Sequence, residues 1–216
     1  MKKIIFLIFL FLGGISGWVW GVAPETYLPL KEGLVWEFQH TFLDLETGKQ
    51  IGAAASVKEN LAPTKLQGIK VVPQNFSFYQ PVGTLKQKTI SFIVQDTGGF
   101  QVVARQSLNE PEPRFLPEKF SILKFPLTKG ASWTQPAEGL SIHNTIEDTA
   151  AAVQVPAGTF KNCLLVKKVY FHQKAPQNAI QEGLFWFAPG VGNVKVVLKN
   201  FPENQEIIQE LVSFKK

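Results

Sequence analysis

The residue types that perform catalysis or bind metals are few and widely spaced in this sequence. Its three histidines, His40, His143 and His172, lack the close spacing of a metal-binding motif, and each falls on a different expected strand. The single cysteine, Cys163, lies among apolar residues. This setting predicts a thiol packed in a core, with a nucleophile or an intermolecular disulfide as alternatives. We expect no metal site and no cofactor.

Other catalytic patterns are weak as well. No G-x-S-x-G nucleophile elbow occurs. The nearest carboxylate pairs, Glu147 with Asp148 and Asp44 with Glu46, fall at an expected strand end and an expected turn, where solvated acids are common. The glycine-rich segment 190–195 lacks the helix that follows a phosphate-binding loop, because residues 194–198 have a strand pattern. We therefore expect no catalytic residues, with a hydrolase site assembled only in three dimensions as an alternative.

The basic residues are not arranged for nucleic-acid binding. The chain has 22 Lys and Arg against 17 Asp and Glu, and only Arg105 and Arg114 are arginines. Nucleic-acid surfaces favour arginine for its planar, forked guanidinium group. The dispersed lysines predict solvated strand faces, with weak attraction to anionic lipid or polysaccharide as the alternative. We expect no nucleic-acid partner.

Aromatic residues are more informative, since the chain has 18 Phe, 5 Trp and 3 Tyr. Because residues 185–187 are all aromatic, their rings must cover both faces of one strand. Two interpretations stay open: a well-filled core, or an apolar cavity for a lipid or acyl chain. The candidates for this core or cavity are Trp36, Phe38, Phe42, Trp133, Phe185, Trp186 and Phe187.

The elements that must position these residues are strands. Apolar and polar residues alternate along 35–43, 90–94 and 100–105, which is the period of a half-buried strand. Asp96-Thr97-Gly98-Gly99 has the composition of a hairpin turn. Similar segments recur at hairpin spacing and predict about ten strands. The expected fold is all-β and mostly antiparallel, a strongly curved sheet or open barrel, with little helix and with a sandwich as the alternative.

The motif P-L-x-x-G-x-x-W occurs twice, at 29–36 and 126–133. Duplicated halves (22–112 and 113–216), two similar corners of one sheet, or chance would each explain it. We favour one continuous β-rich domain, 22–216, with two equivalent corners. The residues expected to shape turns are Gly33, Gly130, Pro156, Gly158, Pro189, Gly190 and Gly192.

The N-terminus predicts export. Lys2 and Lys3 precede an uncharged apolar run at 4–23, the pattern of a secretory signal, with cleavage expected after Gly21. In the alternative interpretation the run stays as a membrane anchor, because it is long enough to span a bilayer once. Both interpretations place the main domain outside the cytoplasm, periplasmic or secreted. The only membrane contact expected is this segment, if it is uncleaved.

Four segments together resemble a known family. They are 27–36, 155–163 (V-P-A-G-T-F-K-N-C), 186–195 (W-F-A-P-G-V-G-N-V-K) and 210–214. In this order they are similar to an uncharacterised family of secreted bacterial β-proteins, a domain of unknown function. The resemblance implies a fold like that of the periplasmic lipoprotein carriers, whose curved sheet wraps an apolar cavity, and it implies no catalytic residues.

The expected function is therefore non-catalytic. We expect an extracytoplasmic protein of the cell envelope that binds an apolar, lipid-like ligand or another envelope component. One alternative is an interaction module that binds a protein through an exposed sheet edge or loop. The second is the hydrolase noted above.

Overall fold

The computed structural model describes residues 22–137 and 139–216, so the predicted signal segment, 1–21, lies outside the described residues. Within them the chain is almost entirely antiparallel β-structure, which confirms the predicted fold class. The helical segments are short 3-10 turns, η1 (Pro24–Tyr27) and η2 (Pro81–Gly83). In the described ranges, no helix combines the length and apolar character needed to span a membrane.

Thirteen strands pair in one sheet. Their bounds are β1 (Val35–Asp44), β2 (Gln50–Asn60), β3 (Thr64–Leu66), β4 (Ile69–Tyr79), β5 (Leu85–Asp96), β6 (Gly99–Ser107), β7 (Arg114–Lys124), β8 (Ser132–Ala137), β9 (Leu140–Val155), β10 (Gly158–His172), β11 (Ala175–Ala188), β12 (Gly192–Asn200) and β13 (Gln205–Lys215). The expectation of about ten was slightly low, because β3 is very short and prolines interrupt the patterns of β7 and β8.

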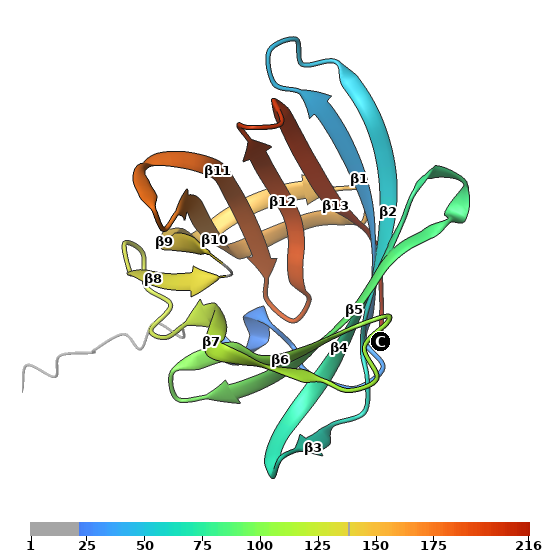
Figure 1. Ribbon diagram of the computed structural model, residues 1–216, viewed down its shortest axis with the longest axis vertical. Helices are drawn as coiled ribbons and strands as arrows, with labels where there is room; N and C mark the ends of the chain where they lie inside the picture. The colour runs from blue at the N-terminus through green and yellow to red at the C-terminus, as the bar shows by residue number, and fades with distance from the viewer. Residues whose placement is uncertain (1–21, 138) are drawn as a thin grey trace, which may run out of the picture.

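The strands follow one another around the sheet in chain order, apart from the short β3, which pairs with β4 alone. Each strand is antiparallel to its neighbours, and the last strand, β13, pairs with the first, β1. The result is an up-and-down meander curled into a nearly closed barrel (Figure 1). The seam lies between β7 and β8, which are not joined by a ladder of backbone hydrogen bonds.

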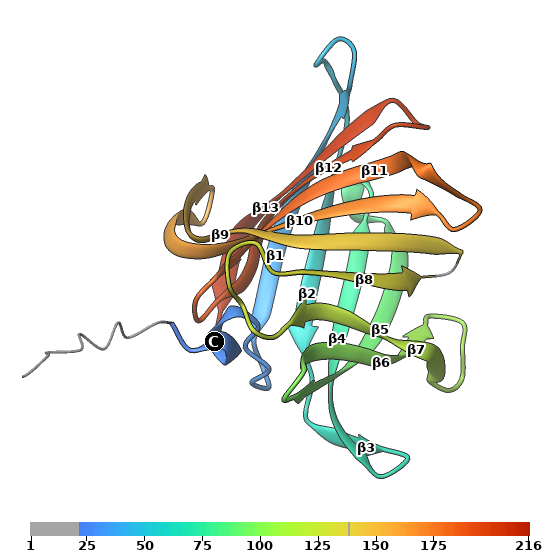
Figure 2. The same cartoon turned by 90° about the vertical axis from the view of Figure 1, so that its left-hand side faces the viewer.

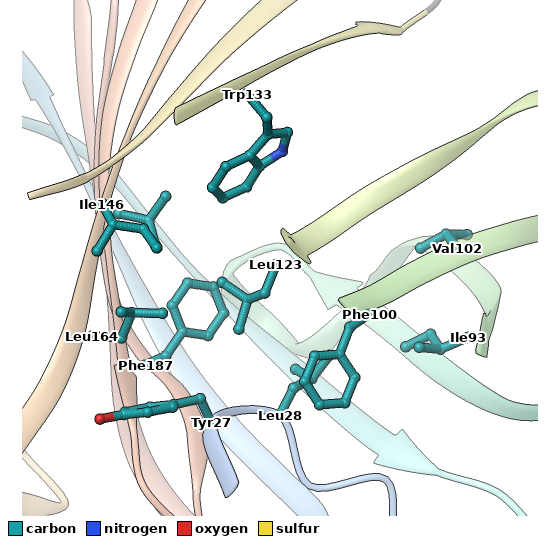
Figure 3. Close-up of a cluster of buried hydrophobic side chains, with 11 residues drawn as sticks. Tyr27, Leu28, Ile93, Phe100, Val102, Leu123, Trp133, Ile146, Leu164 and Phe187 are labelled. Atoms are coloured by element: carbon teal, nitrogen blue, oxygen red, sulfur yellow. The ribbon is translucent and has the colours of Figure 1, made fainter. Parts of the chain in front are cut away.

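The two ends of the barrel differ. At the closed end, where β1 begins and β13 ends, the segment before β1 folds against the sheet (Figure 2). Tyr27 and Leu28 of this segment pack in a core with Trp133, Leu164 and Phe187 (Figure 3). At the open end, where β1 finishes and β13 starts, no such segment is present among the described residues. The barrel is therefore plugged from one side by its own N-terminal segment.

The long β9–β10 hairpin also covers the closed end. Its turn reaches β13, where the Ala157 N–H donates a hydrogen bond to the Leu211 carbonyl at 3.0 Å. Under it lies a second core cluster that includes Trp36 and Cys163. Cys163 is fully buried as a free thiol, which confirms the core prediction, and burial raises its pKa to about 11.

The two P-L-x-x-G-x-x-W segments form matching corners at the closed end. Gly33 and Gly130 have φ angles of +77° and +84°, a region that suits glycine. Their N–H groups donate to the carbonyls of Asn60 and Ile146, at 2.9 and 2.8 Å. In each corner the same strand residue donates back to the residue after the glycine, at 3.0 and 2.9 Å. One corner leads into β1 and the other into β8, while the division into two similar halves stays a prediction.

The other expected turn residues also lie between strands. Pro156 separates β9 from β10, which begins at Gly158, and Pro189 and Gly190 separate β11 from β12, which begins at Gly192. All three of these glycines have positive φ.

Candidate functional site

The interior of the barrel is packed at the closed end and accessible toward the open end. Along β1 the side chains of Trp36, Phe38, His40 and Phe42 share the inward face. The first three are 3%, 2% and 5% exposed, whereas Phe42, nearest the open end, is half-buried. The interior is thus a filled core that opens into an aromatic-lined concave wall.

The other predicted aromatic residues pack into two different core clusters, because those on β11 lie on opposite faces of that strand. Trp133 and Phe187 are buried in the core of Figure 3, and Phe185 packs against it while half-buried. Trp186 faces the opposite way and packs against the second cluster, beneath the β9–β10 hairpin. Of the predicted set, Phe42 and Phe185 are the residues that line the accessible part of the interior.

A pocket of about 350 Å³ lies at the open end beside Phe42. Gly52 and Ala54 of β2 and Phe78 of β4 also line it. Gly52 leaves space for an aromatic ring, because a Cβ atom there would lie 3.3 Å from Cδ2 of Phe42. Small residues therefore flank half-buried aromatic rings, which is the composition of an apolar binding surface.

One cross-strand row connects this pocket to the far wall of the barrel. Its members pair directly from strand to strand and all face inward: Trp133, Asn144, Lys168, Gly183, Leu198, Ile207, Phe42 and Gly52. Between Lys168 and Phe42 the row contains no polar side chain. Sequence reasoning missed this row, because pairing register between strands cannot be read from one chain alone.

Lys168 of β10 is the unusual residue of the row. Its side chain is 4% exposed, and its Nζ lies 5.0 Å from the centre of the Phe185 ring and 5.8 Å from that of Phe120. Gly183 leaves the space that the Phe185 ring occupies, because a Cβ atom at this position would lie only 2.7 Å from the ring. Burial lowers the pKa of Lys168 to about 8.

A second cation approaches the same Phe120 ring from β6. The Arg105 Cζ lies 5.5 Å from the ring centre. Arg105 pairs across strands with Arg114, and both line a pocket of about 210 Å³ at the seam. Its other lining residues are mostly apolar, apart from the exposed Glu118. The chain's only two arginines thus meet at one pocket, although like charges placed opposite each other repel.

A third cation, Lys58 of β2, lies nearer the closed end, opposite Trp36 of β1. Its Nζ is 5.5 Å from the centre of the Phe38 ring, and burial lowers its pKa to about 8. Burial and the nearby Lys58 charge together lower the pKa of His40 to about 4. His40 is therefore neutral at physiological pH.

The inward-facing cations lack acidic partners. Among the described residues, no ion pair joins a carboxylate to Lys58, Arg105 or Lys168. The observed ion pairs lie on the outward face, for example between Lys195 and Glu210 at 2.8 Å. The row also contains a buried indole N–H, at Trp133, with no hydrogen-bond acceptor in the described structure. The interior consequently has an excess of positive charge, a spare donor at Trp133 and a spare acceptor, Asn144 Oδ1, beside it in the row.

The residues considered for catalysis are not brought together. His143 and His172 are exposed, and His143 faces Thr134 on the outer surface. His40 does contact Ser56 Oγ, at 2.8 Å, as the first two members of a serine-type triad would. However, Ser56 is 1% exposed, and no carboxylate hydrogen-bonds to His40 in the described ranges. This pair is a buried structural contact.

One member of each carboxylate pair serves local structure, and the other, Glu147 or Glu46, is exposed. Asp148 accepts hydrogen bonds from the backbone N–H groups of residues 149 and 150, and Asp44 accepts from Thr47 in the β1–β2 turn. In the part of the chain that is described, no three His, Cys, Asp or Glu side chains cluster as metal ligands would.

The sequence matches no protein-family model and no curated protein. A β-barrel-like protein of the domain of unknown function DUF1849, from Brucella abortus, has a TM-score of 0.50 at 13% identity, over 85% of this chain and 97% of that one. A candidate exported protein with a YmcC-like fold from Bacteroides fragilis has a TM-score of 0.47 at 17% identity, over 87% and 98%. A candidate lipoprotein from Parabacteroides distasonis has 0.44 at 16%, over 88% and 98%. The predicted likeness to secreted β-proteins of unknown function is thus confirmed, and at these identities it shows the fold alone.

Proposed function

We propose that this protein is a non-catalytic, extracytoplasmic binding protein whose half-open barrel holds an apolar, lipid-like ligand. The observation that carries the proposal is the inward face near the open end. There the rings of Phe42 and Phe78 stay half-buried around a pocket of about 350 Å³, while at the other end the N-terminal segment packs into the core. Apolar side chains that remain accessible inside a barrel favour a ligand of the same character.

An extracytoplasmic location is supported by the basic and apolar N-terminal segment. The exported and lipoprotein descriptions of two proteins with a related fold agree with it. Recognition of a protein by strand addition is less favoured, because it needs a long free sheet edge. The edges of β7 and β8 face each other and are joined by the side chain of Gln135, and the free edge of β3 spans only three residues.

Binding is tested with Nile red, an uncharged fluorophore that brightens in apolar surroundings. We expect saturable binding to the wild type and a loss of about tenfold or more in affinity for Ala54→Trp, because the indole would fill the pocket. The matched control is Ala55→Trp, since Ala55 neighbours Ala54 but faces outward and is exposed. Lipid extraction and mass spectrometry of gently purified protein would identify a resident ligand. Absence of saturable Nile red binding to the wild type would overturn the proposal.

A further inference from the structure

Three cations face the interior of this barrel without acidic partners. Lys168 is the most completely buried of them. A charged group taken out of water is costly unless an opposite charge or hydrogen-bond acceptors replace the lost hydration. In the described structure, Lys168 Nζ and the Arg105 guanidinium lie over aromatic rings and have no hydrogen bond or ion pair. Their arrangement is therefore incomplete without an anion.

Lys168 and Arg105 converge although they come from opposite sides of the seam. Lys168 lies on β10 and Arg105 on β6, and both approach the ring of Phe120 on β7, at 5.8 and 5.5 Å from its centre. The unpartnered indole N–H of Trp133 belongs to the same cross-strand row as Lys168. The ammonium and the guanidinium that approach one ring are donors suited to a carboxylate or phosphate group, and the indole N–H lies two strands from Lys168 in the row.

The row that begins at Lys168 continues as apolar wall. Gly183, Leu198 and Ile207 follow it on β11, β12 and β13, and the row reaches Phe42 on β1. Four strand spacings separate Lys168 from Phe42, roughly 19 Å along the wall. This distance matches a long acyl chain, and the wall ends at the pocket lined by Phe42 and Phe78.

On the basis of the proposed function, we infer that the ligand is an anionic amphiphile. Its carboxylate or phosphate group lies between Lys168 and Arg105 beside Phe120, and its acyl chain follows Leu198 and Ile207 toward the open end. An uncharged lipid would leave both cations uncompensated, and a free small anion would leave the aromatic wall uncovered.

The test measures displacement of Nile red by four competitors: dodecanoate, dodecyl phosphate, dodecanol and inorganic phosphate. For the wild type we expect at least one charged amphiphile to compete about tenfold or more better than dodecanol, and inorganic phosphate not to compete. Comparison of dodecanoate with dodecyl phosphate distinguishes the two headgroups. Lys168→Met and Arg105→Gln should each remove most of this preference while Nile red still binds. Lys167→Met is the matched control, because Lys167 faces outward and pairs with Glu182.

Each outcome decides one claim. Equal competition by dodecanol and the charged amphiphiles would overturn the inference and leave the proposed function standing. Competition by inorganic phosphate as strong as that by dodecyl phosphate would show a site for free anions and would also overturn it. Failure of Nile red to bind the wild type would reject the proposed function itself. Circular dichroism and thermal unfolding confirm that each variant is folded.

Discussion

The most consequential residue of this protein is a lysine that a sequence scan cannot distinguish from its neighbours. Lys167 and Lys168 are adjacent, yet the first pairs with Glu182 outside the barrel and the second lies inside among aromatic rings. The alternation of a strand produces this difference, because consecutive side chains point to opposite faces. The dispersed lysines were predicted to be solvated, and Lys168 and Lys58, which face the interior, show that this prediction was wrong for two of them.

The depressed pKa of Lys168 predicts a dependence of stability on pH. Its pKa is about 8 in the folded protein against 10.5 ordinarily. Between these values the unfolded chain binds more protons, so the free energy of unfolding rises with pH, by up to about 3 kcal/mol. Lys168→Met should be more stable than the wild type at pH 7. The difference in unfolding free energy between the two proteins should become smaller between pH 8 and 10. Urea unfolding at pH 7, 8, 9 and 10 measures this difference.

The comparison ends at pH 10, because burial raises the pKa of Tyr170 to about 12, and this group lowers stability at still higher pH. Lys167→Met is again the control, and its stability should follow the wild type across the range. Parallel profiles for Lys168→Met and the wild type would show that the ammonium stays hydrated in the folded protein.

At the scale of elements, the seam between β7 and β8 is closed by a side chain in place of a backbone ladder. The Ser121 N–H donates to Gln135 Oε1 at 2.8 Å, and Gln135 Nε2 donates to the Ser121 carbonyl at 3.1 Å. The amide side chain thus reproduces the pair of N–H···O hydrogen bonds that two residues exchange in an antiparallel strand pair. Pro117 on β7 and Pro136 on β8 also have no N–H to donate across the seam, as is usual for prolines on edge strands.

The seam gives a prediction for Gln135→Ala. Loss of both hydrogen bonds leaves the Ser121 peptide group without its partners and should cost about 1–3 kcal/mol of unfolding free energy. Amide hydrogen exchange should accelerate in β7 and β8 and stay unchanged at the β1–β13 pair. Gln39→Ala is the control, since Gln39 is exposed and its one hydrogen bond, to Glu210, is long at 3.3 Å. Uniform acceleration across all strands would show that the seam is not a separate opening unit.

Much of this architecture could be predicted, for reasons visible in particular elements. The alternation of Trp36, Phe38, His40 and Phe42 set the inward face of β1, since one buried face imposes period two. The seam could not be foreseen, because Gln135 has no local feature that distinguishes it from other strand glutamines. The convergence of residues from β6, β7 and β10 depends on barrel closure, and no local pattern encodes closure.

At the scale of the whole molecule, the two ends of the barrel have different tasks. The closed end supplies stability through the N-terminal plug, where Leu28 and Tyr27 are buried and the Tyr27 hydroxyl donates to the Asn162 carbonyl at 3.1 Å. The open end supplies the binding surface at Phe42 and Phe78. A protein divided in this way tolerates an accessible apolar wall, because its core does not depend on filling that wall.

This division predicts opposite effects of two substitutions. Leu28→Ala leaves a cavity in the plugged core and should lower the free energy of unfolding by about 2–4 kcal/mol, with Nile red affinity unchanged. Ala54→Trp should reduce Nile red affinity with little change in stability, because its side chain lies at the accessible pocket. Urea unfolding and fluorescence titration measure both quantities, and Val22→Ala, at an exposed residue of the same segment, is the control for Leu28. If Leu28→Ala kept the stability of the wild type and lost affinity for Nile red, the ligand would bind at the closed end. The proposed division of tasks between the two ends would then be wrong.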